Sequence, residues 1–239
     1  MTLSAFHIFP DPDGVAEAAA EQLLATVAAA ENVCHVALSG GSTPKLLFQL
    51  LATPAYQERM DWDKLHLYWG DERCVPWDHS DSNYGQTRQL LLDRVPIPAG
   101  QVHPIDGAQL DPAAEARRYS QLLWQHLPVN GSWPSFDLIF LGMGADGHTA
   151  SIFPDQMNLL YSSACCAVAI HPESGQRRVS LTGQLINAAR QVTFLVTGKD
   201  KAPKVNAIRN QQPGFQHYPA AHIHPAGCLD WYLDAPASM

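Results

Sequence analysis

Short apolar runs recur along the chain and are separated by longer stretches of mixed polarity. Apolar runs of about four to eight residues, bounded by glycine, proline or charged residues, are typical of strands buried inside a sheet. The run that ends at Leu141 and the run that ends at Thr197 show this most clearly. We predict strands at residues 5–9, 35–38, 65–69, 136–141, 167–170, 179–181 and 192–197.

Helices are expected between most of these strands. Residues 11–30 are rich in alanine, with Asp11 placed to cap a helix and Pro12 suited to its first turn. Further helices are predicted at residues 44–51, 84–92, 112–126 and 202–210, with a helical turn at 183–189. Strands that alternate with helices favour an α/β fold, in which helices flank a doubly wound and mostly parallel sheet.

The length and composition of the chain indicate which class of protein it belongs to. The chain has 239 residues, of which 46% are hydrophobic, so it can bury a large core, and we expect one α/β domain over residues 1–239. The sequence lacks the roughly 18 uninterrupted apolar residues of a membrane helix. The first ten residues lack the pattern of a secretory signal. Five scattered cysteines, an odd number, favour free thiols and a cytoplasmic location.

The polar residues that follow the apolar run at 136–141 carry the clearest chemical signal. Gly142 and Gly144 allow the chain to turn sharply where the predicted strand ends. Asp146 and His148 come next, so a carboxylate and a titratable imidazole lie two residues apart. Ligands of open α/β sheets bind at the carboxyl ends of the strands. We therefore interpret this segment as an active-site loop.

A second motif, Ser39-Gly-Gly-Ser-Thr-Pro44, joins a predicted strand to a predicted helix. Its glycines allow close approach of the backbone, and Ser42 or Thr43 is placed to cap the helix, so amides and hydroxyls would face an anion such as phosphate. The spacing matches neither a Walker loop nor a dinucleotide-binding loop. A well-capped helix without a ligand explains this motif alone equally well. The overlap with the S-x-x-K pattern of serine acyl enzymes is interpreted as coincidence, because no K-T-G partner is present.

A third motif follows the strand predicted at residues 65–69 and places Asp71, Glu72 and Arg73 together. For Glu72, a solvated turn held by a local ion pair is as good an interpretation as a functional role. The Arg73 guanidinium is a stronger candidate, because it can make two parallel hydrogen bonds to a phosphate.

The remaining cations are few. The formal net charge of −8 argues against general affinity for nucleic acid, whose phosphates attract clustered lysine and arginine. Arg178 lies in a short predicted strand, and Lys199 and Lys201 follow the strong strand predicted at 192–197, where ligand sites concentrate. These side chains are expected to act locally on a small anion.

Together, these motifs resemble the 6-phosphogluconolactonase family, within the larger group that also contains the glucosamine-6-phosphate deaminases. The resemblance covers almost the whole chain, through segments at residues 39–44, 70–73, 82–84, 142–154, 178–182 and 197–202. It implies a Rossmann-like fold similar to that of the deaminases. It also implies hydrolysis of 6-phosphoglucono-δ-lactone to 6-phosphogluconate, the second step of the oxidative pentose phosphate pathway.

The resemblance further implies roles for single residues. His148 would deprotonate the attacking water, and Asp146 would set the orientation or charge of the imidazole. Independently of the resemblance, we expect amides of the glycine loops or a nearby cation to hold the oxyanion. Ser42, Thr43, Arg73, Arg178 and Lys201 would meet the phosphate, and Asp71 and Asn83 the sugar hydroxyls. The full set of expected substrate-binding residues is Ser39, Gly40, Gly41, Ser42, Thr43, Asp71, Arg73, Asn83, Gly144, Arg178 and Lys201.

This scheme requires a phosphorylated sugar lactone as the partner and no metal or organic cofactor. Monomer and homodimer both stay open. A zinc site is not expected, because the spacing of the nearest ligand-type residues matches no structural zinc pattern. Those residues are His217, His222, His224 and Cys228.

Two other functions are compatible with parts of this pattern. An amino-sugar phosphate deaminase or isomerase would use the same loop, which in that relative typically resembles D-G-H-I-A-F-N-E-P and holds a glutamate for ring opening. Here residues 146–154 contain no glutamate and Asp155 lies beyond the proline, which favours the lactonase. A non-catalytic sugar-phosphate sensor would not need a base, so the retained Asp146 and His148 argue against it.

Overall fold

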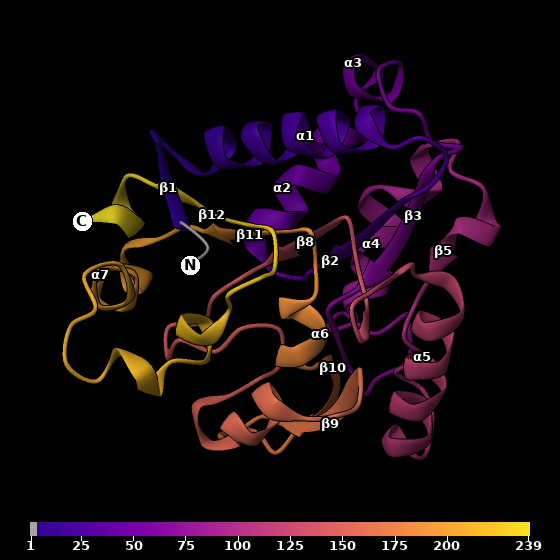
Figure 1. Ribbon diagram of the computed structural model, residues 1–239. Coiled ribbons are helices and arrows are strands. Elements are labelled where there is room, and N and C mark those ends of the chain that lie inside the picture. The colour runs from indigo at the N-terminus through magenta and orange to yellow at the C-terminus, as the bar shows by residue number, and fades with distance from the viewer. Residues whose placement is uncertain (1–3) are drawn as a thin grey trace.

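A parallel sheet of seven strands forms the centre of the molecule (Figure 1). The computed structural model describes residues 4–239; residues 1–3, which begin the segment considered for a secretory signal, lie outside the described residues. The strand order is β1-β12-β11-β8-β2-β3-β5. The strands are β1 (Ser4–Phe9), β2 (Cys34–Leu38), β3 (Leu65–Trp69), β5 (Val102–His103), β8 (Leu138–Leu141), β11 (Gln191–Val196) and β12 (Cys228–Asp234).

The order of the strands reverses between β2 and β8. From β2 the chain continues through β3 to the β5 edge, whereas from β8 it continues through β11 to β12 on the other side. The loops that leave β2 and β8 therefore diverge and open a crevice at the carboxyl ends of these strands. This arrangement confirms the predicted doubly wound α/β fold.

Helices cover both faces of the sheet. In Figure 1, α1 and α2 lie over one face, and α6 lies on the other, together with a second sheet. The helices are α1 (Pro12–Ala29), α2 (Ser42–Leu51), α3 (Pro54–Gln57), α4 (Asn83–Leu90), α5 (Pro112–His126), α6 (Gly183–Asn187) and α7 (Ala202–Arg209). Asp11 caps α1 as predicted, because its carboxylate accepts a hydrogen bond from the Gly14 amide at 2.9 Å. Across residues 4–239, no helix is both long and apolar enough to cross a membrane.

The second sheet is antiparallel and has the order β4-β10-β9. Its strands are β4 (Asp71–Arg73), β9 (Cys166–Ile170) and β10 (Arg177–Leu181). The two short strands predicted around residues 167–181 are thus present, but they lie outside the parallel sheet. The register of β10 on β4 pairs Arg178 with Arg73 and Ser180 with Asp71, so this sheet brings two distant cations side by side. A hairpin of β6 (Val129–Asn130) and β7 (Trp133–Pro134) completes the strands of the described chain.

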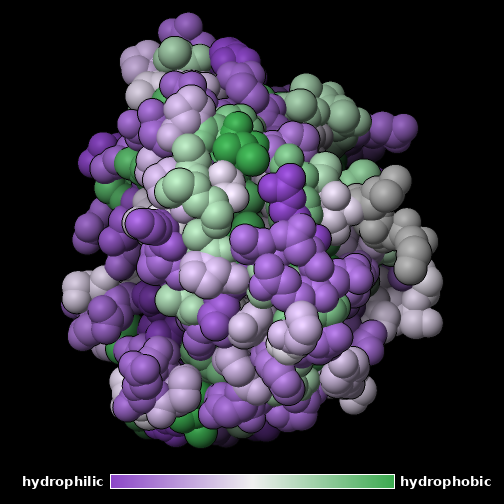
Figure 2. All heavy atoms as spheres, turned by 90° about the vertical axis from the view of Figure 1, so that its left-hand side faces the viewer, coloured by the Kyte–Doolittle hydropathy of each residue, from purple (hydrophilic) through white to green (hydrophobic). Residues whose placement is uncertain are grey.

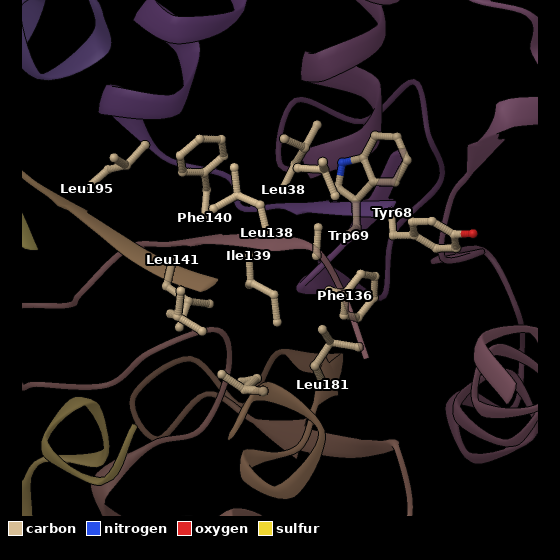
Figure 3. Close-up of a cluster of buried hydrophobic side chains, with 14 of the residues drawn as sticks. Leu38, Tyr68, Trp69, Phe136, Leu138, Ile139, Phe140, Leu141, Leu181 and Leu195 are labelled. Carbon is tan, nitrogen blue, oxygen red and sulfur yellow. The ribbon is translucent and has the colours of Figure 1, made fainter. Parts of the chain in front are cut away.

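The core lies on both faces of the central strands. All four residues of β8 are buried, which explains the uninterrupted apolar run in the sequence. Figure 3 shows Leu138 and Phe140 on the side that α1 and α2 cover. Ile139 and Leu141 point to the opposite side, toward Leu181 of β10. Each such buried side chain contributes about 1.5–3 kcal/mol to folding, so the strand that carries the predicted active-site loop is firmly anchored.

Candidate active site

A cavity of about 240 Å³ lies at the carboxyl ends of β2, β8 and β11, where the strand order reverses. All eleven substrate-binding residues predicted from the sequence line it, and so does His148. Asp146 lies outside the lining and contacts the cavity through His148. The other lining residues are Pro44, Gly142, Met143, Ala150, Leu195, Val196 and Thr197.

The imidazole of His148 and the carboxylate of Asp146 form a close pair. Nδ1 of His148 lies 2.7 Å from Oδ1 of Asp146, and the His148 amide donates to the same oxygen at 3.1 Å. Burial alone would raise the pKa of Asp146, but the hydrogen bonds and charge of His148 outweigh it and lower this pKa to about 2. An ionised Asp146 accepts a hydrogen bond from Nδ1–H of His148, so the proton of the neutral imidazole stays on Nδ1 and Nε2 can accept a proton from water.

Two glycines allow the loop to hold this pair. A Cβ atom on Gly144 would lie 2.2 Å from Nδ1 of His148 and 2.5 Å from Oδ1 of Asp146, so only glycine fits there. Gly147 has a φ of +89°, and a Cβ atom on it would lie 2.7 Å from Tyr218. Both backbone positions therefore require the glycines that the sequence motif contains.

The loop between β2 and α2 is held by hydroxyl groups. Oγ of Ser39 donates to the carbonyl of Phe140 at 2.9 Å, which ties the end of β2 to β8. Oγ1 of Thr43 lies 2.7 Å from Oγ1 of Thr197, which ties the start of α2 to the end of β11. The N-cap of α2 is Gly41, with a φ of 120° and no side-chain hydrogen bond. The prediction that Ser42 or Thr43 caps this helix is therefore wrong, and both residues line the cavity instead.

Glu72 is not part of a solvated turn, so that interpretation is wrong. Its side chain is 1% exposed and its carboxylate accepts four hydrogen bonds. The donors are the amides of Arg73, Asn83 and Tyr84, each at 2.8 Å, and Oγ of Ser82 at 3.0 Å. Burial raises the pKa of this carboxyl above its ordinary value, although the amide donors oppose the change. Glu72 thus joins β4 to the start of α4.

Asp71 carries the only carboxylate in the lining of the described cavity. Its Oδ2 accepts a hydrogen bond from Oγ of Ser151 at 2.6 Å and lies 3.8 Å from Nη1 of Arg178. Nδ2 of Asn83 donates to the backbone carbonyl of Asp71 at 2.9 Å and to Oδ1 at 3.2 Å. These contacts fix Asp71 and Asn83 in one wall of the cavity.

Three cations, Arg73, Arg178 and Lys201, line the cavity, whereas Lys199 does not. Nη1 of Arg73 donates to the carbonyl of Asp81 at 2.6 Å, and Nζ of Lys201 lies 2.6 Å from a carboxylate oxygen of Asp200. Within residues 4–239, the buried Nε atoms of Arg73 and Arg178 have no hydrogen-bond partner. A site with more positive than negative side chains and with free guanidinium donors suits an anion.

Sequence reasoning missed several residues that build this site. Ser151 and Thr197 lie inside the recognised motifs, but their roles depend on partners far away in the chain, Asp71 and Thr43. Ala150 has a φ of 48°, which no local signal predicts for an alanine. Among the residues that the structure describes, no three histidine, cysteine, aspartate or glutamate side chains gather as ligands for a metal ion.

Comparison with known proteins identifies the relatives of the chain. Residues 10–231 match the family described as glucosamine-6-phosphate isomerases/6-phosphogluconolactonase. A 6-phosphogluconolactonase of Haemophilus influenzae is 46% identical over 204 residues, which make up 85% of this chain and 85% of the relative. The structure of a 6-phosphogluconolactonase from Trypanosoma brucei gives a TM-score of 0.86 at 28% identity and covers 100% of this chain and 98% of its own.

The fold also extends to a more distant protein. The structure of a monomeric glucosamine-6-phosphate deaminase gives a TM-score of 0.81 at 18% identity, and the match covers 98% of each chain. At this identity the likeness concerns the fold alone. It confirms the predicted similarity to the fold of the deaminases.

Proposed function

The chain belongs to the glucosamine-6-phosphate isomerase/6-phosphogluconolactonase family and is an enzyme of its 6-phosphogluconolactonase branch; we propose that it hydrolyses 6-phosphoglucono-δ-lactone through a water molecule that His148 activates. The observation that carries this proposal is the 2.7 Å contact between His148 and Asp146 beside a cavity lined by three cations. A base and an anion site within one cavity match a substrate that has both a lactone and a phosphate. The reaction belongs to the oxidative pentose phosphate pathway, and the expected location is the cytoplasm.

The proposed reaction has two steps. Nε2 of His148 takes a proton from water, and the oxygen of that water forms a bond to the lactone carbonyl carbon. The tetrahedral intermediate then breaks the bond between this carbon and the ring oxygen, which takes the proton back from the imidazolium and leaves as a hydroxyl group. The ionised Asp146 accepts a hydrogen bond from Nδ1–H of His148 throughout and stabilises the imidazolium that forms between the steps.

The phosphate group is assigned to the cations and to the start of α2. Arg73, Arg178 and Lys201 supply charge-assisted donors, and the Nε atoms of both arginines are free to donate. Ser42 and Thr43 lie in the first turn of α2, where the exposed amides and the helix dipole also favour an anion. These contacts would hold the ring so that the lactone carbonyl meets the water beside His148.

The other predicted contacts are those to the sugar hydroxyls and to the oxyanion. Asp71 and Asn83 are assigned to the sugar hydroxyls, with Ser39, Gly40 and Gly41 forming the adjacent wall. The amide of Gly144 donates to the carbonyl of His148 at 2.9 Å, so it is not free to hold the oxyanion. That role is left to the other amides of the glycine loops or to a cation of the cavity.

The alternative reaction, ring opening and deamination of an amino-sugar phosphate, has less support. Within the described chain, no glutamate lines the cavity. Glu72 lies behind the wall, and its carboxylate oxygens already accept four hydrogen bonds. The carboxylate that ring opening requires in the relatives with the D-G-H-I-A-F-N-E-P loop has no counterpart here.

Replacement of His148 by alanine tests the proposal. We expect kcat for 6-phosphoglucono-δ-lactone to fall by about 10²–10⁴-fold, because the general base is lost, while KM changes little because the phosphate contacts stay. The rate is measured in a coupled assay after subtraction of spontaneous hydrolysis, and replacement of the exposed His217 by alanine serves as the control. Near-normal turnover in the His148 variant would refute the base assignment. Ammonia release from glucosamine 6-phosphate by the unmodified enzyme would favour the alternative reaction.

A further inference from the structure

The ring of Phe153 contacts both groups to which the proposed reaction assigns different tasks, His148 and Arg178. Its centroid is 4.8 Å from that of the His148 ring, with an angle of 53° between the ring planes. Cζ of Arg178 lies over the same Phe153 ring, 5.6 Å from its centroid. The ring is fully buried, so it lines no part of the cavity and cannot touch a substrate.

A tight turn in the loop brings this ring against the imidazole of His148. The amide of Ile152 donates to the carbonyl of Thr149 at 2.9 Å, which reverses the chain directly after the histidine. Oγ1 of Thr149 donates to the carbonyl of Gly142 at 2.9 Å and fastens the turn to the end of β8. The chain then enters a short 3₁₀-helix at Pro154, for which Phe153 is the N-cap residue. The position of the phenyl ring is therefore set by the backbone of the same loop that carries His148.

Arg178 has few other restraints. Its Nη1 lies 3.4 Å from Oγ of Ser151 and 3.8 Å from Oδ2 of Asp71, both longer than a good charge-assisted hydrogen bond. Its Nε is buried without a partner among the described residues. The side chain of Arg178 is nevertheless only 12% exposed. The face of the Phe153 ring is thus a main contact of this guanidinium, and such a contact is strongest where water is excluded.

We propose that Phe153 is a positioning residue that holds the imidazole of His148 and the guanidinium of Arg178 at a fixed separation. This inference rests on the proposed function, in which His148 serves the lactone carbonyl and Arg178 the phosphate. A fixed separation between these groups selects δ-lactones that carry a phosphate at the matching distance. Phe153 therefore contributes to the preference for phosphorylated over plain lactones, although it does not touch either.

Two substitutions of Phe153 test this role against a core control. Phe153→Leu removes the aromatic face, and Phe153→Met does the same with an unbranched, more flexible side chain of similar volume. Phe136→Leu is the control, because Phe136 is equally buried but packs on Tyr68, away from the cavity. Each variant is assayed on 6-phosphoglucono-δ-lactone and on glucono-δ-lactone, and its folding is checked by thermal unfolding.

We expect both Phe153 variants to lower the ratio of kcat/KM for the phosphorylated lactone to that for the plain lactone by about three- to tenfold. Phe136→Leu should leave this ratio within about twofold of the wild-type value, even if it lowers thermal stability as much. In an Arg178→Met background, Phe153→Leu should not lower the ratio further, because the guanidinium that the ring positions is already absent.

The outcomes separate the inference from the proposed function. If the wild-type enzyme hydrolyses neither lactone, the proposed function fails. If it prefers the phosphorylated lactone and the Phe153 variants keep that preference, the positioning role is wrong while the function stands. Losses of preference that multiply in the Phe153→Leu, Arg178→Met double variant would also overturn it, because they would show that the two residues act independently.

Discussion

The Asp146 carboxylate stays ionised over the whole neutral range, because its pKa is about 2. Burial raises the pKa of Asp146, so the hydrogen bonds from His148 and its charge must lower this pKa by more than burial raises it. A depressed carboxyl pKa adds stability above the unfolded value of 3.8, and this contribution is lost as pH falls from 3.8 toward 2. A loss of activity between pH 5 and 7 therefore cannot come from protonation of Asp146.

The same pair depends on a residue with no side chain. Replacement of Gly144 by alanine places a Cβ atom 2.2 Å from Nδ1 of His148, so the imidazole or the loop has to move. We expect kcat for the phosphorylated lactone to fall by about 100-fold, since misplacement of a catalytic group by about 1 Å has an effect of this size. Steady-state kinetics of the variant measure this loss.

A second glycine provides the control for that substitution. A Cβ atom on Gly100 would meet nothing within 4 Å, so Gly100→Ala should keep wild-type kinetics. Equal activity of Gly144→Ala and the wild-type enzyme would contradict the inferred contact between the loop backbone and the imidazole. A loss shared by both variants would show that the effect is not local.

Residue types and spacing predict the members of the site but not the contacts between them. The glycines, Asp146 and His148 are recognisable because the backbone geometry and the chemistry of the loop require those types. The hydrogen bond from Ser151 to Asp71 spans 80 positions in the sequence and leaves no local trace. The solvated turn predicted for Glu72 is wrong for the same reason, since three of its four donors come from residues 82–84.

At the scale of elements, local periodicity predicted strands better than their partners. The helix predicted at residues 112–126 and the strand predicted at 65–69 have the observed bounds. No element was predicted at β12, although Leu229, Trp231 and Leu233 alternate with more exposed residues, which is a strand signal. The assignment of β9 and β10 to a separate sheet depends on pairing with β4, and a strand of three charged residues has no apolar pattern.

The junction of β4 and α4 should be sensitive to loss of the Glu72 carboxylate, which is 1% exposed. Glu72→Ala leaves three amides and one hydroxyl without an acceptor, and we expect the free energy of unfolding to fall by about 2–4 kcal/mol. The same change removes the acceptor for the backbone amides of Arg73 and Asn83, two residues that line the cavity. Their positions become less fixed, so KM for the phosphorylated lactone should rise severalfold. Urea denaturation and steady-state kinetics provide the two measurements.

The matched control for this junction is a carboxylate on the surface. Glu21 pairs with Arg59 at 2.6 Å, and both side chains are 51% exposed, so Glu21→Ala should change stability by less than about 1 kcal/mol. It should also leave KM unchanged, because neither residue lines the cavity. If Glu72→Ala behaves like Glu21→Ala in both measurements, the carboxylate does not join β4 to α4 in the way inferred.

At the scale of the whole molecule, the reversal of strand order explains why distant motifs meet in one cavity. The loops after β2, β8 and β11 converge there, and β10 adds Arg178 from the second sheet. On the side of the molecule that carries the β1 edge, hydrophilic residues predominate and apolar residues lie in small groups (Figure 2). A single domain over residues 1–239 stays a prediction.

A cluster of histidines lies near the amino ends of β2 and β3, away from this cavity. Nδ1 of His35 lies 3.1 Å from the hydroxyl of Tyr68, and Nδ1 of His66 lies 3.1 Å from Nε2 of His103. His126 of α5 packs on the His103 ring, with 4.7 Å between ring centroids. Burial lowers the pKa of His35 and of His103 to about 4, and it also lowers the pKa of His66. His35, His66 and His103 are therefore neutral in the folded enzyme near pH 7.

This cluster makes the stability of the whole fold depend on pH. Between pH 6.5 and 4 the unfolded chain binds protons that buried His35 and His103 do not, so stability falls as pH falls through 6.5, and the loss is complete below about 4. We expect each histidine to account for at most about 2 kcal/mol of the loss between pH 7.5 and 5. Urea denaturation of His103→Gln should therefore show a shallower fall than the wild-type enzyme, whereas exposed His217→Gln should keep the wild-type slope. Parallel curves for all three proteins would mean that the acid sensitivity arises elsewhere in the molecule.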